Sequence, residues 1–328
     1  MKQRVLITGG SGFLGYHLLQ EAVLEGYEVF AAVRKSSNTA HLNNLPVQFT
    51  EINYEDEAAL IEAIAENEYK FIIHAAGVTR ADTEAAYDKI NAGYTEVLAK
   101  AAAALNGQVE RFVLISSLAA TGPVGYHQNL ITEAEQGTPV TAYGRSKLKA
   151  EQCLQHIQVP YTIIRPTAIY GPRDKDLFLI SRSISRGIDA YIGKIPQQLS
   201  FVHAADVAAA VMAALRLNRQ NHLYNITDGA LYGRYDFADI TKKLLGKKAL
   251  RLHLPVGLVK SALLLAETVA KLKNKVPVVN REKLAELMAE NWGCDISLAK
   301  AELEFNPRFN LESGLADTIA WYKANKWV

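Results

Sequence analysis

The sequence has little cysteine, and this scarcity excludes one common kind of metal site. Its 328 residues include only two cysteines, Cys153 and Cys294, and neither belongs to a Cys-x-x-Cys pair or a Cys/His cluster. A structural zinc site needs several such residues at short spacings. We therefore expect no metal, and the low count suits a reducing compartment.

An excess of charge of either sign is also missing. The 36 basic and 34 acidic residues give a formal net charge of +2, and no basic block interrupts the chain. Proteins that attract nucleic acid or anionic membranes usually carry a basic patch or stripe. From this composition we expect neither of them as a partner.

Long apolar runs are absent as well. The start of the chain passes from MKQR directly into the strand-like VLITGG, which leaves no room for a signal peptide and favours a cytoplasmic location. The most membrane-like stretch, 256–270, is interrupted by Lys260 and Glu267 and is too short for a span. We expect no membrane span, and an amphipathic helix packed on the protein at this stretch. Interfacial membrane contact is the alternative.

What the chain has instead is a regular alternation of strand and helix patterns through its first two-thirds. Short runs rich in Val and Ile are typical of parallel strands that are buried on both faces. Between them, 14–26, 56–68 and 94–107 repeat apolar residues at helical spacing. The alternation predicts an α/β fold, a doubly wound parallel sheet of the Rossmann type. The strand-like runs are 4–8, 27–33, 47–52, 71–76, 111–117 and 161–166.

The alternation of strand and helix patterns ends after about Pro166. Loops and short helices follow, a strand-like run returns at 222–227, and the tail looks mostly helical. We predict a smaller, mostly helical substrate-binding domain packed on the sheet, with the substrate cleft between the two parts. The predicted dinucleotide-binding domain is 1–166 and 200–227, and the predicted substrate-binding domain is 167–199 and 228–328.

The glycines between the first strand and the first helix form the clearest motif. The segment VLITGGSGFLG places Gly9, Gly12 and Gly15 three residues apart. Glycines allow a tight turn and a close backbone approach, so that a pyrophosphate can meet the N–H groups and the positive dipole of the helix start. A purely structural glycine turn is the alternative.

With Thr8 in front, this spacing resembles the extended short-chain dehydrogenase/reductase superfamily (NAD-dependent epimerase/dehydratase family), closest in pattern to its dihydroflavonol reductase and β-hydroxysteroid dehydrogenase branch. The resemblance covers nearly the whole chain, including SFVHAADVA and the closing ELEFNPRFNLESGLADTIAWY. It implies cofactor contacts from the glycine loop, from EINYED, from the small-residue turn HAAG and from the Arg-Pro turn of IIRPTAIYGP. We expect His74, in HAAG, to be structural. The implied cofactor-binding residues are Gly9, Ser11, Gly12, Phe13, Leu14, Gly15, Glu51, Ile52, Ala75, Ala76, Gly77, Pro166, Thr167 and Ile169.

The end of the second strand indicates which cofactor is preferred. A site for NAD usually carries Asp or Glu there, which holds the ribose hydroxyls and repels a 2′-phosphate. This chain has Val33, followed by Arg34 and Lys35. Because an arginine fork can pair with a phosphate, we expect NADP to bind through Arg34 and Lys35, with NAD as the alternative. Both cations could also be solvated loop charges.

The segment TAYGRSK places Tyr143 four residues before Lys147, on one side of an expected helix. Ser117 lies 26 residues before Tyr143, a spacing that resembles the Ser-Tyr-Lys constellation of the superfamily. A free tyrosine has a pKa of ~10, and we expect Lys147 to lower it while Ser117 hydrogen-bonds the substrate oxygen. The resemblance also implies that Tyr143 and Lys147 contact the cofactor, Lys147 through the nicotinamide ribose. Ser116 is the competing serine, but Ser117 better matches the family's distance to Gly122.

These features predict an NADP-dependent oxidoreductase that interconverts a ketone or aldehyde and an alcohol. A nucleotide-sugar epimerase or dehydratase with tightly bound NAD is the alternative, and a non-catalytic NADP-sensing regulator is a third. Nucleotide-sugar enzymes commonly carry an arginine just before the F-V-H segment, where this chain has Leu199 and Ser200. A clamp for the diphosphate would then come from Arg173, Arg182 or Arg186.

The partner that we expect is a small-molecule substrate, and a homodimer fits the resemblance. Loop residues near the expected cleft are Thr79, Tyr126, His127 and Phe178.

Overall fold

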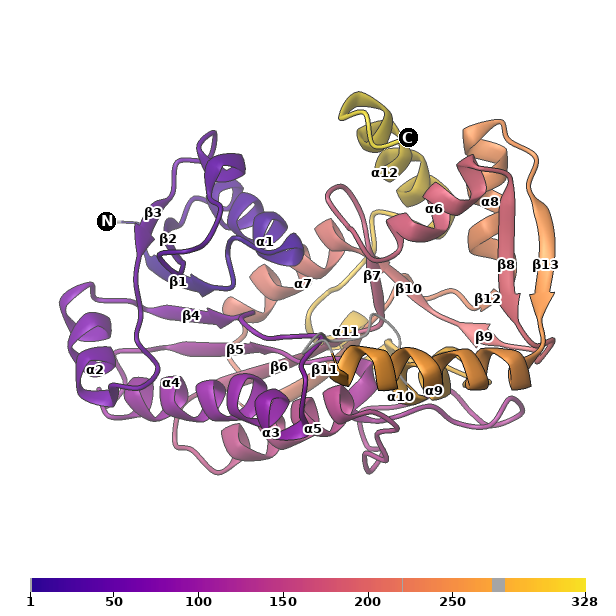
Figure 1. The fold of residues 1–328 in the computed structure, drawn as a ribbon. Coiled ribbons are helices and arrows are strands. Elements are labelled where there is room, and N and C mark those ends of the chain that lie inside the picture. The colour runs from indigo at the N-terminus through magenta and orange to yellow at the C-terminus, as the bar shows by residue number, and fades with distance from the viewer. Residues whose placement is uncertain (1, 220, 273–280) are drawn as a thin grey trace.

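The computed structural model describes residues 2–219, 221–272 and 281–328. A seven-stranded sheet forms its centre, with every neighbouring pair parallel and the strand order β11-β6-β5-β4-β1-β2-β3 (Figure 1). The order reverses between β1 and β4, and such a switch point is where open α/β sheets bind ligands. The strands are β1 (Arg4–Thr8), β2 (Glu28–Ala32), β3 (Gln48–Thr50), β4 (Phe71–His74), β5 (Arg111–Ile115), β6 (Tyr161–Pro166) and β11 (His222–Ile226).

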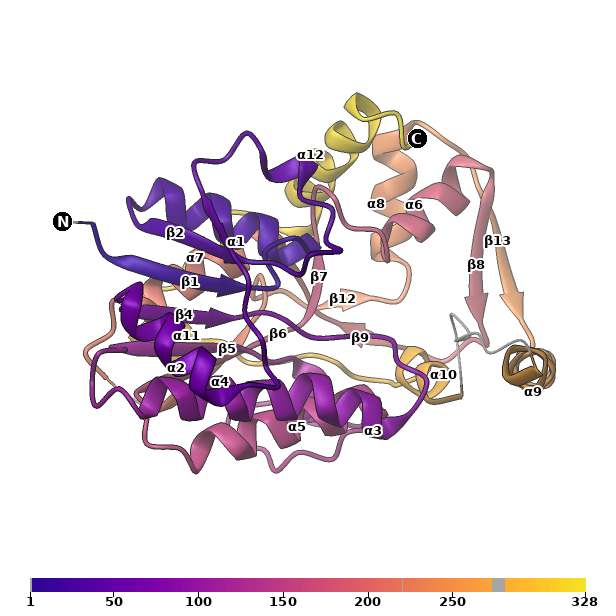
Figure 2. The same cartoon turned by 60° about the vertical axis from the view of Figure 1, so that its left-hand side comes forward.

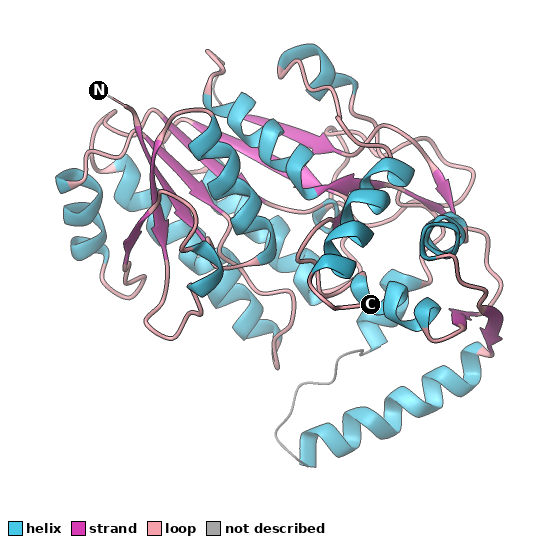
Figure 3. Ribbon diagram, turned by 90° about the horizontal axis from the view of Figure 1, so that it is seen from above, coloured by secondary structure: helices cyan, strands magenta, loops and turns pink. Residues whose placement is uncertain are grey.

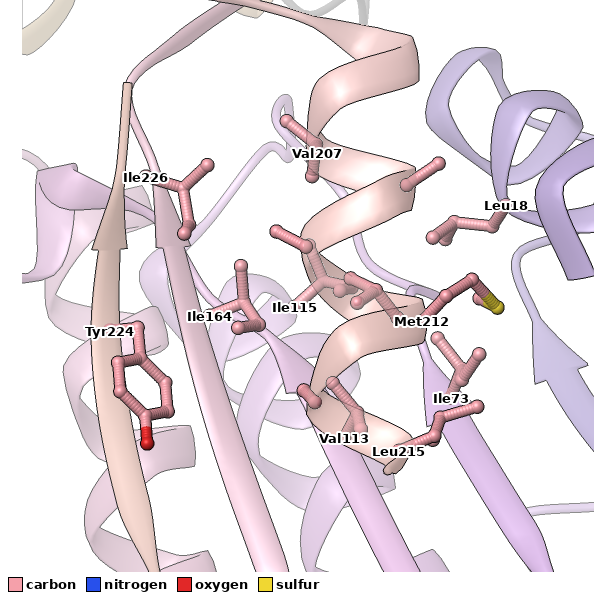
Figure 4. Packing of buried hydrophobic residues seen from close by; sticks show 14 of the residues in the cluster. Leu18, Ile73, Val113, Ile115, Ile164, Val207, Met212, Leu215, Tyr224 and Ile226 are labelled. Atoms are coloured by element: carbon pink, nitrogen blue, oxygen red, sulfur yellow. The ribbon is translucent and has the colours of Figure 1, made fainter. Parts of the chain in front are cut away.

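Helices cover both faces of this sheet. On one face, Leu18 of the first helix meets Val207 and Met212 of α7, and these side chains pack on Ile115 and Ile164 of the strands (Figure 4). Three helices cover the other face through a second apolar cluster. The predicted doubly wound sheet is therefore confirmed. The helices are α1 (Phe13–Leu24) and α7 (Ala204–Leu215) on the first face, and α2 (Glu57–Glu66), α4 (Tyr94–Ala103) and α5 (Ala142–Gln155) on the second.

Short helical turns connect these layers on the side of the second face. A turn of α-helix, α3 (Glu84–Tyr87), runs directly into a π-helical turn, Asp88–Gly93, and then into α4. The 3₁₀ turns are Ala40–Leu42 and Leu118–Ala120.

The smaller part contains three two-stranded sheets beside its helices (Figure 2). Its apolar cluster contains Tyr170, Phe201 and Phe237, with Leu311 and Leu315 from the last helix. The strand pairs are β7 (Ala168–Tyr170) with β10 (Phe201–His203), β9 (Gln198–Leu199) with β12 (Tyr232–Gly233), and β8 (Ile188–Ile192) with β13 (Leu250–Leu254). The helices are α6 (Phe178–Ser185), α8 (Asp236–Leu245), α9 (Val256–Leu272), α10 (Arg281–Leu287), α11 (Ser297–Glu302) and α12 (Leu311–Ala324).

One expectation for this part needs correction. The strands β8 and β13 were not expected, although LRLHL in β13 alternates apolar and polar residues as a strand with two different faces does. The helix expected at 256–270 is present as α9. Among its described side chains, those of Val256–Leu264, Val256 and Val259 are partly buried and Leu263 is buried, at helical spacing, and the others are exposed. One side of this stretch therefore packs on the protein, as expected of an amphipathic helix. Among the described helices, none is both long and apolar enough to cross a bilayer.

The chain returns to the large sheet near its end. Cys294, Ile296 and Phe305, which flank α11, belong to the same apolar cluster as α1 and α7. Ile131 forms a parallel bridge with Cys294, and Val124 an antiparallel bridge with Asn291. The tail therefore contributes to the core of the large sheet as well as to the smaller part.

Candidate functional site

The glycine loop forms a backbone cradle at the carboxyl end of β1. Gly9 has φ +71°, and a Cβ there would lie 2.7 Å from the carbonyl carbon of Ala75, in the turn after β4. The N–H of Gly12 donates to the carbonyl oxygen of Gly9 at 2.9 Å. Because Gly12 has no side chain to cap α1, the first N–H groups of the helix are left for an anion. The loop therefore fits a dinucleotide pyrophosphate, as the sequence predicted.

Thr8 and His74 connect this cradle to the turn after β4. The hydroxyl of Thr8 is 2.8 Å from Nδ1 of His74 and accepts a hydrogen bond from the N–H of Ala76 at 3.1 Å. His74 is 1% exposed, and burial lowers its pKa to about 3. The expectation that His74 is structural is confirmed, because a buried neutral imidazole here fixes the relative position of two loops.

Two cations follow β2 where a carboxylate would mark an NAD site. Lys35 forms an exposed ion pair with Glu51, at 3.7 Å between Nζ and Oε2. Arg34 is also exposed, and its positive charge acts on the phenol of Tyr54, whose pKa burial raises. Ile52 packs against the second apolar cluster. Arg34 thus presents a guanidinium next to the turn after β3, whereas Lys35 is partly neutralised by Glu51.

The structure separates the two candidate serines. Ser117 hydrogen-bonds the Tyr143 side chain and caps the 3₁₀ turn that follows β5. Ser116 is 3% exposed and donates to the carboxylate of Glu151. Ser117 therefore lies beside the phenol of Tyr143. Ser116 lies instead beside the buried carboxylate of Glu151.

Lys147 lies beside the small-residue turn after β4. Its Nζ donates to the carbonyl oxygen of Ile115 at 2.6 Å, and a Cβ on Gly77 would lie 3.8 Å from that Nζ. The nearest atom to such a Cβ is Oδ1 of Asn91, at 2.9 Å, so a side chain at Gly77 would collide with Asn91 and only touch Lys147. Tyr143, Lys147, Ser117 and Gly77 thus converge at the carboxyl ends of β4 and β5.

Burial sets the charge states of this group. It raises the pKa of Tyr143 to about 12, against a smaller opposing effect of the hydrogen bond with Ser117. It also lowers the pKa of Lys147 to about 8, while the carboxylate of Glu151 acts in the opposite direction. We expected Lys147 to lower the pKa of Tyr143, and that expectation is wrong for this structure. Both side chains lie in a poorly hydrated site, which favours the neutral phenol of Tyr143 and the neutral amine of Lys147.

Sequence reasoning missed Asn91, which joins the catalytic helix to the β4 turn. Its Oδ1 accepts from the N–H of Val78 at 2.8 Å, and its Nδ2 donates to the hydroxyl of Ser146 at 2.9 Å. Ser146 in turn donates to the carbonyl oxygen of Tyr143 at 2.7 Å. Asn91 is 1% exposed in the π-helical turn, and an asparagine inside an apolar helical pattern was the signal for it.

Sequence reasoning also missed a buried ion pair beneath the site. Glu151 accepts from Nε of Arg165 at 2.9 Å and from Nη2 at 2.5 Å, and both residues are at most 4% exposed. Because Glu151 also accepts from Ser116, it joins α5 to the ends of β5 and β6. Its place one helical turn after Lys147 was a signal in the sequence.

Comparison with known proteins assigns the family. The family model for the NAD dependent epimerase/dehydratase family matches residues 5–227, which is more than half of the chain. The chain belongs to this family. It is an NAD(P)-dependent enzyme of the extended short-chain dehydrogenase/reductase type, which confirms the resemblance stated above.

The relatives of this family member include both oxidoreductases and epimerases. It is 27% identical to a ceramide reductase of Caulobacter vibrioides over 99% of this chain and 96% of the relative. It is 26% identical to a decarboxylating sterol-4-alpha-carboxylate 3-dehydrogenase of Dictyostelium discoideum, over 95% and 99% of the two chains. A solved UDP-glucose 4-epimerase of Thermotoga maritima, with UDP-glucose, shares the fold with a TM-score of 0.80 and 21% identity, over 99% and 100%. Other solved structures with this fold contain NAD.

The Arg-Pro turn of this family member lies at the carboxyl end of β6. Pro166 pairs with Ile226 of β11, and Thr167 donates its N–H to the carbonyl oxygen of Ile226 at 3.1 Å. The hydroxyl of Thr167 is buried without a partner among the described residues. Ile169 is partly buried against the large apolar cluster. The turn therefore lies at the carboxyl ends of the strands, as the glycine loop does. The hydroxyl of Thr167 is left to hydrogen-bond a ligand.

The arginines considered as a diphosphate clamp lie elsewhere. The guanidinium of Arg173 stacks over the ring of Tyr16 at 4.0 Å, on the side of α1. Arg182 and Arg186 are exposed, in and directly after α6. Arg234, which follows β12 and was not considered, donates to the carbonyl oxygens of Ile192 and Ile195. The described structure thus gives no arginine at the place of Leu199 and Ser200.

The expected loop residues are divided among three places. The carbonyl oxygen of Thr79 accepts from the hydroxyl of Tyr87, whose ring is 6.5 Å from that of Tyr143. Tyr126 donates its N–H to Glu290 at 3.2 Å, and its ring contacts His127. Phe178 instead lies in an aromatic cluster with Tyr322 and Trp327. Thr79 is therefore close to Tyr143, whereas Phe178 packs against the C-terminal helix.

Helix α10 is tied directly to the first turn of α5. One carboxylate oxygen of Glu282 accepts from the N–H of Ala142 at 2.6 Å, and the other accepts from Arg145 at 2.9 Å. This contact joins α10 to the residue before Tyr143. Two segments that are 140 residues apart in the sequence are thus held together by one carboxylate.

Proposed function

We propose that this protein is an NADP-dependent oxidoreductase that interconverts a ketone or aldehyde and the matching alcohol. The observation that carries this proposal is the convergence of Tyr143, Ser117 and Lys147 at the carboxyl ends of β4 and β5. A carbonyl oxygen in that place can receive a proton from Tyr143 while Ser117 donates a hydrogen bond to it. When bound, the nicotinamide supplies or accepts the hydride.

The protonation state of Tyr143 supports its role as the proton donor. A phenol with a pKa of about 12 is protonated near neutral pH, so Tyr143 holds the proton that a developing alkoxide needs. Lys147 is positioned by the carbonyl oxygen of Ile115 and supported electrostatically by Glu151. In the reductive direction the carbonyl carbon gains the hydride, its oxygen gains the phenolic proton, and Tyr143 is reprotonated from solvent.

The preference for NADP rests on the end of β2. Arg34 follows Val33 directly, no carboxylate occupies that place, and Lys35 is already paired with Glu51. An exposed guanidinium can form two parallel hydrogen bonds with a 2′-phosphate. We therefore assign the phosphate contact chiefly to Arg34.

A nucleotide-sugar epimerase or dehydratase with bound NAD is the second candidate, since the family contains both classes. The absence of a described arginine at Leu199 and Ser200 argues against it, because a buried diphosphate needs cationic partners. The names of two relatives, a ceramide reductase and a sterol dehydrogenase, favour a carbonyl or alcohol on a less charged substrate.

Fluorescence titration of the purified protein with NADPH and NADH tests this proposal. We expect NADPH to bind at least tenfold more tightly, a difference of about 1.4 kcal/mol. Arg34→Ser should remove most of that preference, whereas Lys35→Ser, the matched control, should change it little. A preference for NADH would overturn the NADP assignment, and it or a tightly bound cofactor that does not exchange would move the epimerase or dehydratase to the front.

A further inference from the structure

The outer face of the β8–β13 sheet is apolar and exposed. In β13, Leu250, Leu252 and Leu254 point to one side and are 68%, 39% and 44% exposed. Arg251 and His253 point to the other side, where they contact the rings of Tyr191 and Tyr235. The parallel register pairs the three leucines with Ile188, Ala190 and Ile192 of β8.

The neighbouring elements add further exposed apolar side chains. Ile188 is 45% exposed, and Leu258 in the first turn of α9 is 68% exposed. Figure 3 shows α9 at the edge of the molecule, following the two strands. Contiguous apolar surface of this kind marks a binding surface for a partner or a membrane. We call the side chains of Ile188, Leu250, Leu252, Leu254 and Leu258 the leucine face.

The segment that carries most of the leucine face is rich in basic residues, and the half-exposed Asp239 nearby is paired with Arg251 and Lys242. The segment from Gly246 to Leu264 contains three lysines and one arginine and no acidic residue. Lys247 and Lys248 precede β13, and Lys260 lies in α9, all three exposed. The acidic residue of β8, Asp189, is 3% exposed and is held by Lys242 and Arg251 on the inner side. The small net charge of the whole chain therefore conceals a local basic rim.

We propose that the leucine face docks on an anionic lipid surface. Peripheral proteins bind such surfaces by inserting exposed apolar side chains between the headgroups and the acyl chains, while neighbouring lysines attract the anionic headgroups. A second copy of the chain fits less well, since a two-fold contact through this face would bring like-charged lysines together. The expectation from overall charge that no anionic membrane is a partner is thus replaced by a local interaction.

The docking stands on the exposed residues alone, and it holds whichever reaction the family member carries out.

Cosedimentation of the full chain with vesicles tests the proposal. We expect binding to vesicles of phosphatidylcholine with phosphatidylglycerol, weaker binding to phosphatidylcholine alone, and a decrease with added salt. Leu250→Ser with Leu252→Ser should weaken binding about tenfold or more, because two apolar side chains no longer enter the interface. Lys247→Glu with Lys248→Glu should weaken binding to anionic vesicles by a similar factor.

The matched control is Leu24→Ser, at an equally exposed leucine in α1, on the Rossmann part. It should leave vesicle binding unchanged. Titration with NADPH shows that each variant is folded. Failure of the wild-type chain to bind anionic vesicles would overturn the proposal, as would equal binding by the Leu250/Leu252 variant. A dimer in sedimentation analysis that this variant alone dissociates, with no vesicle binding, would assign the face to a subunit interface instead.

Discussion

Arg145, in the helix that carries Tyr143, forms an ion pair with Glu282 of α10, with 2.9 Å between Nη2 and Oε1. Arg145 also donates to Glu84 of α3 at 2.6 Å, so it lies between two carboxylates from distant segments. These contacts raise the pKa of Arg145 and hold three elements around the catalytic helix. The helix that carries Tyr143 is thus held in part by a segment outside the large sheet.

Glu282→Gln should alter turnover more than stability. Glutamine keeps one oxygen for the N–H of Ala142 but loses the charge that pairs with Arg145, so α10 is held less firmly over the site. Because the pair is 38% exposed on each side, we expect a stability loss of less than about 1 kcal/mol. We expect kcat/KM to fall by about tenfold, as a misplaced catalytic group would cause. Glu96→Gln, which breaks a surface pair with Lys100, is the matched control, and equal kinetics for both variants would refute the positioning role.

The two neighbouring serines should have separate effects. Ser117→Ala removes a hydrogen-bond donor beside Tyr143, and we expect kcat to fall by roughly a hundredfold with unchanged cofactor affinity. Ser116→Ala removes a donor to the buried carboxylate of Glu151, and we expect a loss of about 1–3 kcal/mol in unfolding free energy with nearly normal kcat. Steady-state kinetics and urea unfolding of the two variants measure this. The reverse pattern would assign the catalytic role to Ser116.

Two glycines with positive φ should differ in their tolerance of alanine. Both Gly9 and Gly26 have φ near the left-handed region, so each alanine costs about 1–2 kcal/mol in backbone strain. A Cβ at Gly9 also collides with Ala75, whereas a Cβ at Gly26 meets nothing within 4 Å. We expect Gly9→Ala to abolish NADPH binding and Gly26→Ala to preserve it in the fluorescence titration. Retained binding by Gly9→Ala would show that the cradle is not the pyrophosphate site.

His74 should make the protein sensitive to acid. The folded state keeps His74 neutral down to a pH of about 3, whereas the unfolded chain binds a proton near pH 6.5. Unfolded molecules therefore bind more protons between these values, and the unfolding free energy falls as the pH decreases from 6.5, by up to ~1.4 kcal/mol per pH unit. His17, with a pKa lowered to about 4 by burial, adds to this slope.

Urea unfolding between pH 4 and 7 measures the effect. His74→Asn should flatten the slope, because asparagine can still hydrogen-bond Thr8 but does not titrate. His156→Asn, at an exposed histidine, is the control and should leave the slope as it is. An unchanged slope for His74→Asn would mean that other groups govern the acid response.

The sequence was sufficient to predict the large sheet because each strand is a short run rich in Val and Ile, and each helix repeats apolar residues at helical spacing. The resemblance of its Ser-Tyr-Lys spacing to that of the superfamily was enough to expect Ser117 near Tyr143. The catalytic roles stay predictions. The sequence did not predict the pKa of Tyr143, which depends on how deeply the phenol is buried. It did not predict the contact of Glu282 with Ala142 either, because nothing local marks a pairing of segments so far apart.

The tail was harder to predict for a related reason. Its strand β13 pairs with β8, more than fifty residues earlier in the sequence. The apolar side chains of both strands are exposed, so neither has the continuous apolar pattern of a buried strand. Propensity alone cannot distinguish such a face from an amphipathic helix.

The route of the chain has a consequence for how the molecule can be divided. Because Cys294, Ile296 and Phe305 belong to the core of the large sheet, the last quarter of the chain supplies part of the interior that the first two-thirds enclose. A fragment that stops at residue 227 would expose that interior to water, and a fragment that begins there would lack the surface it folds against. We therefore expect that neither part folds when it is expressed alone, and that a chimaera with a homologue must carry 294–305 together with the large sheet.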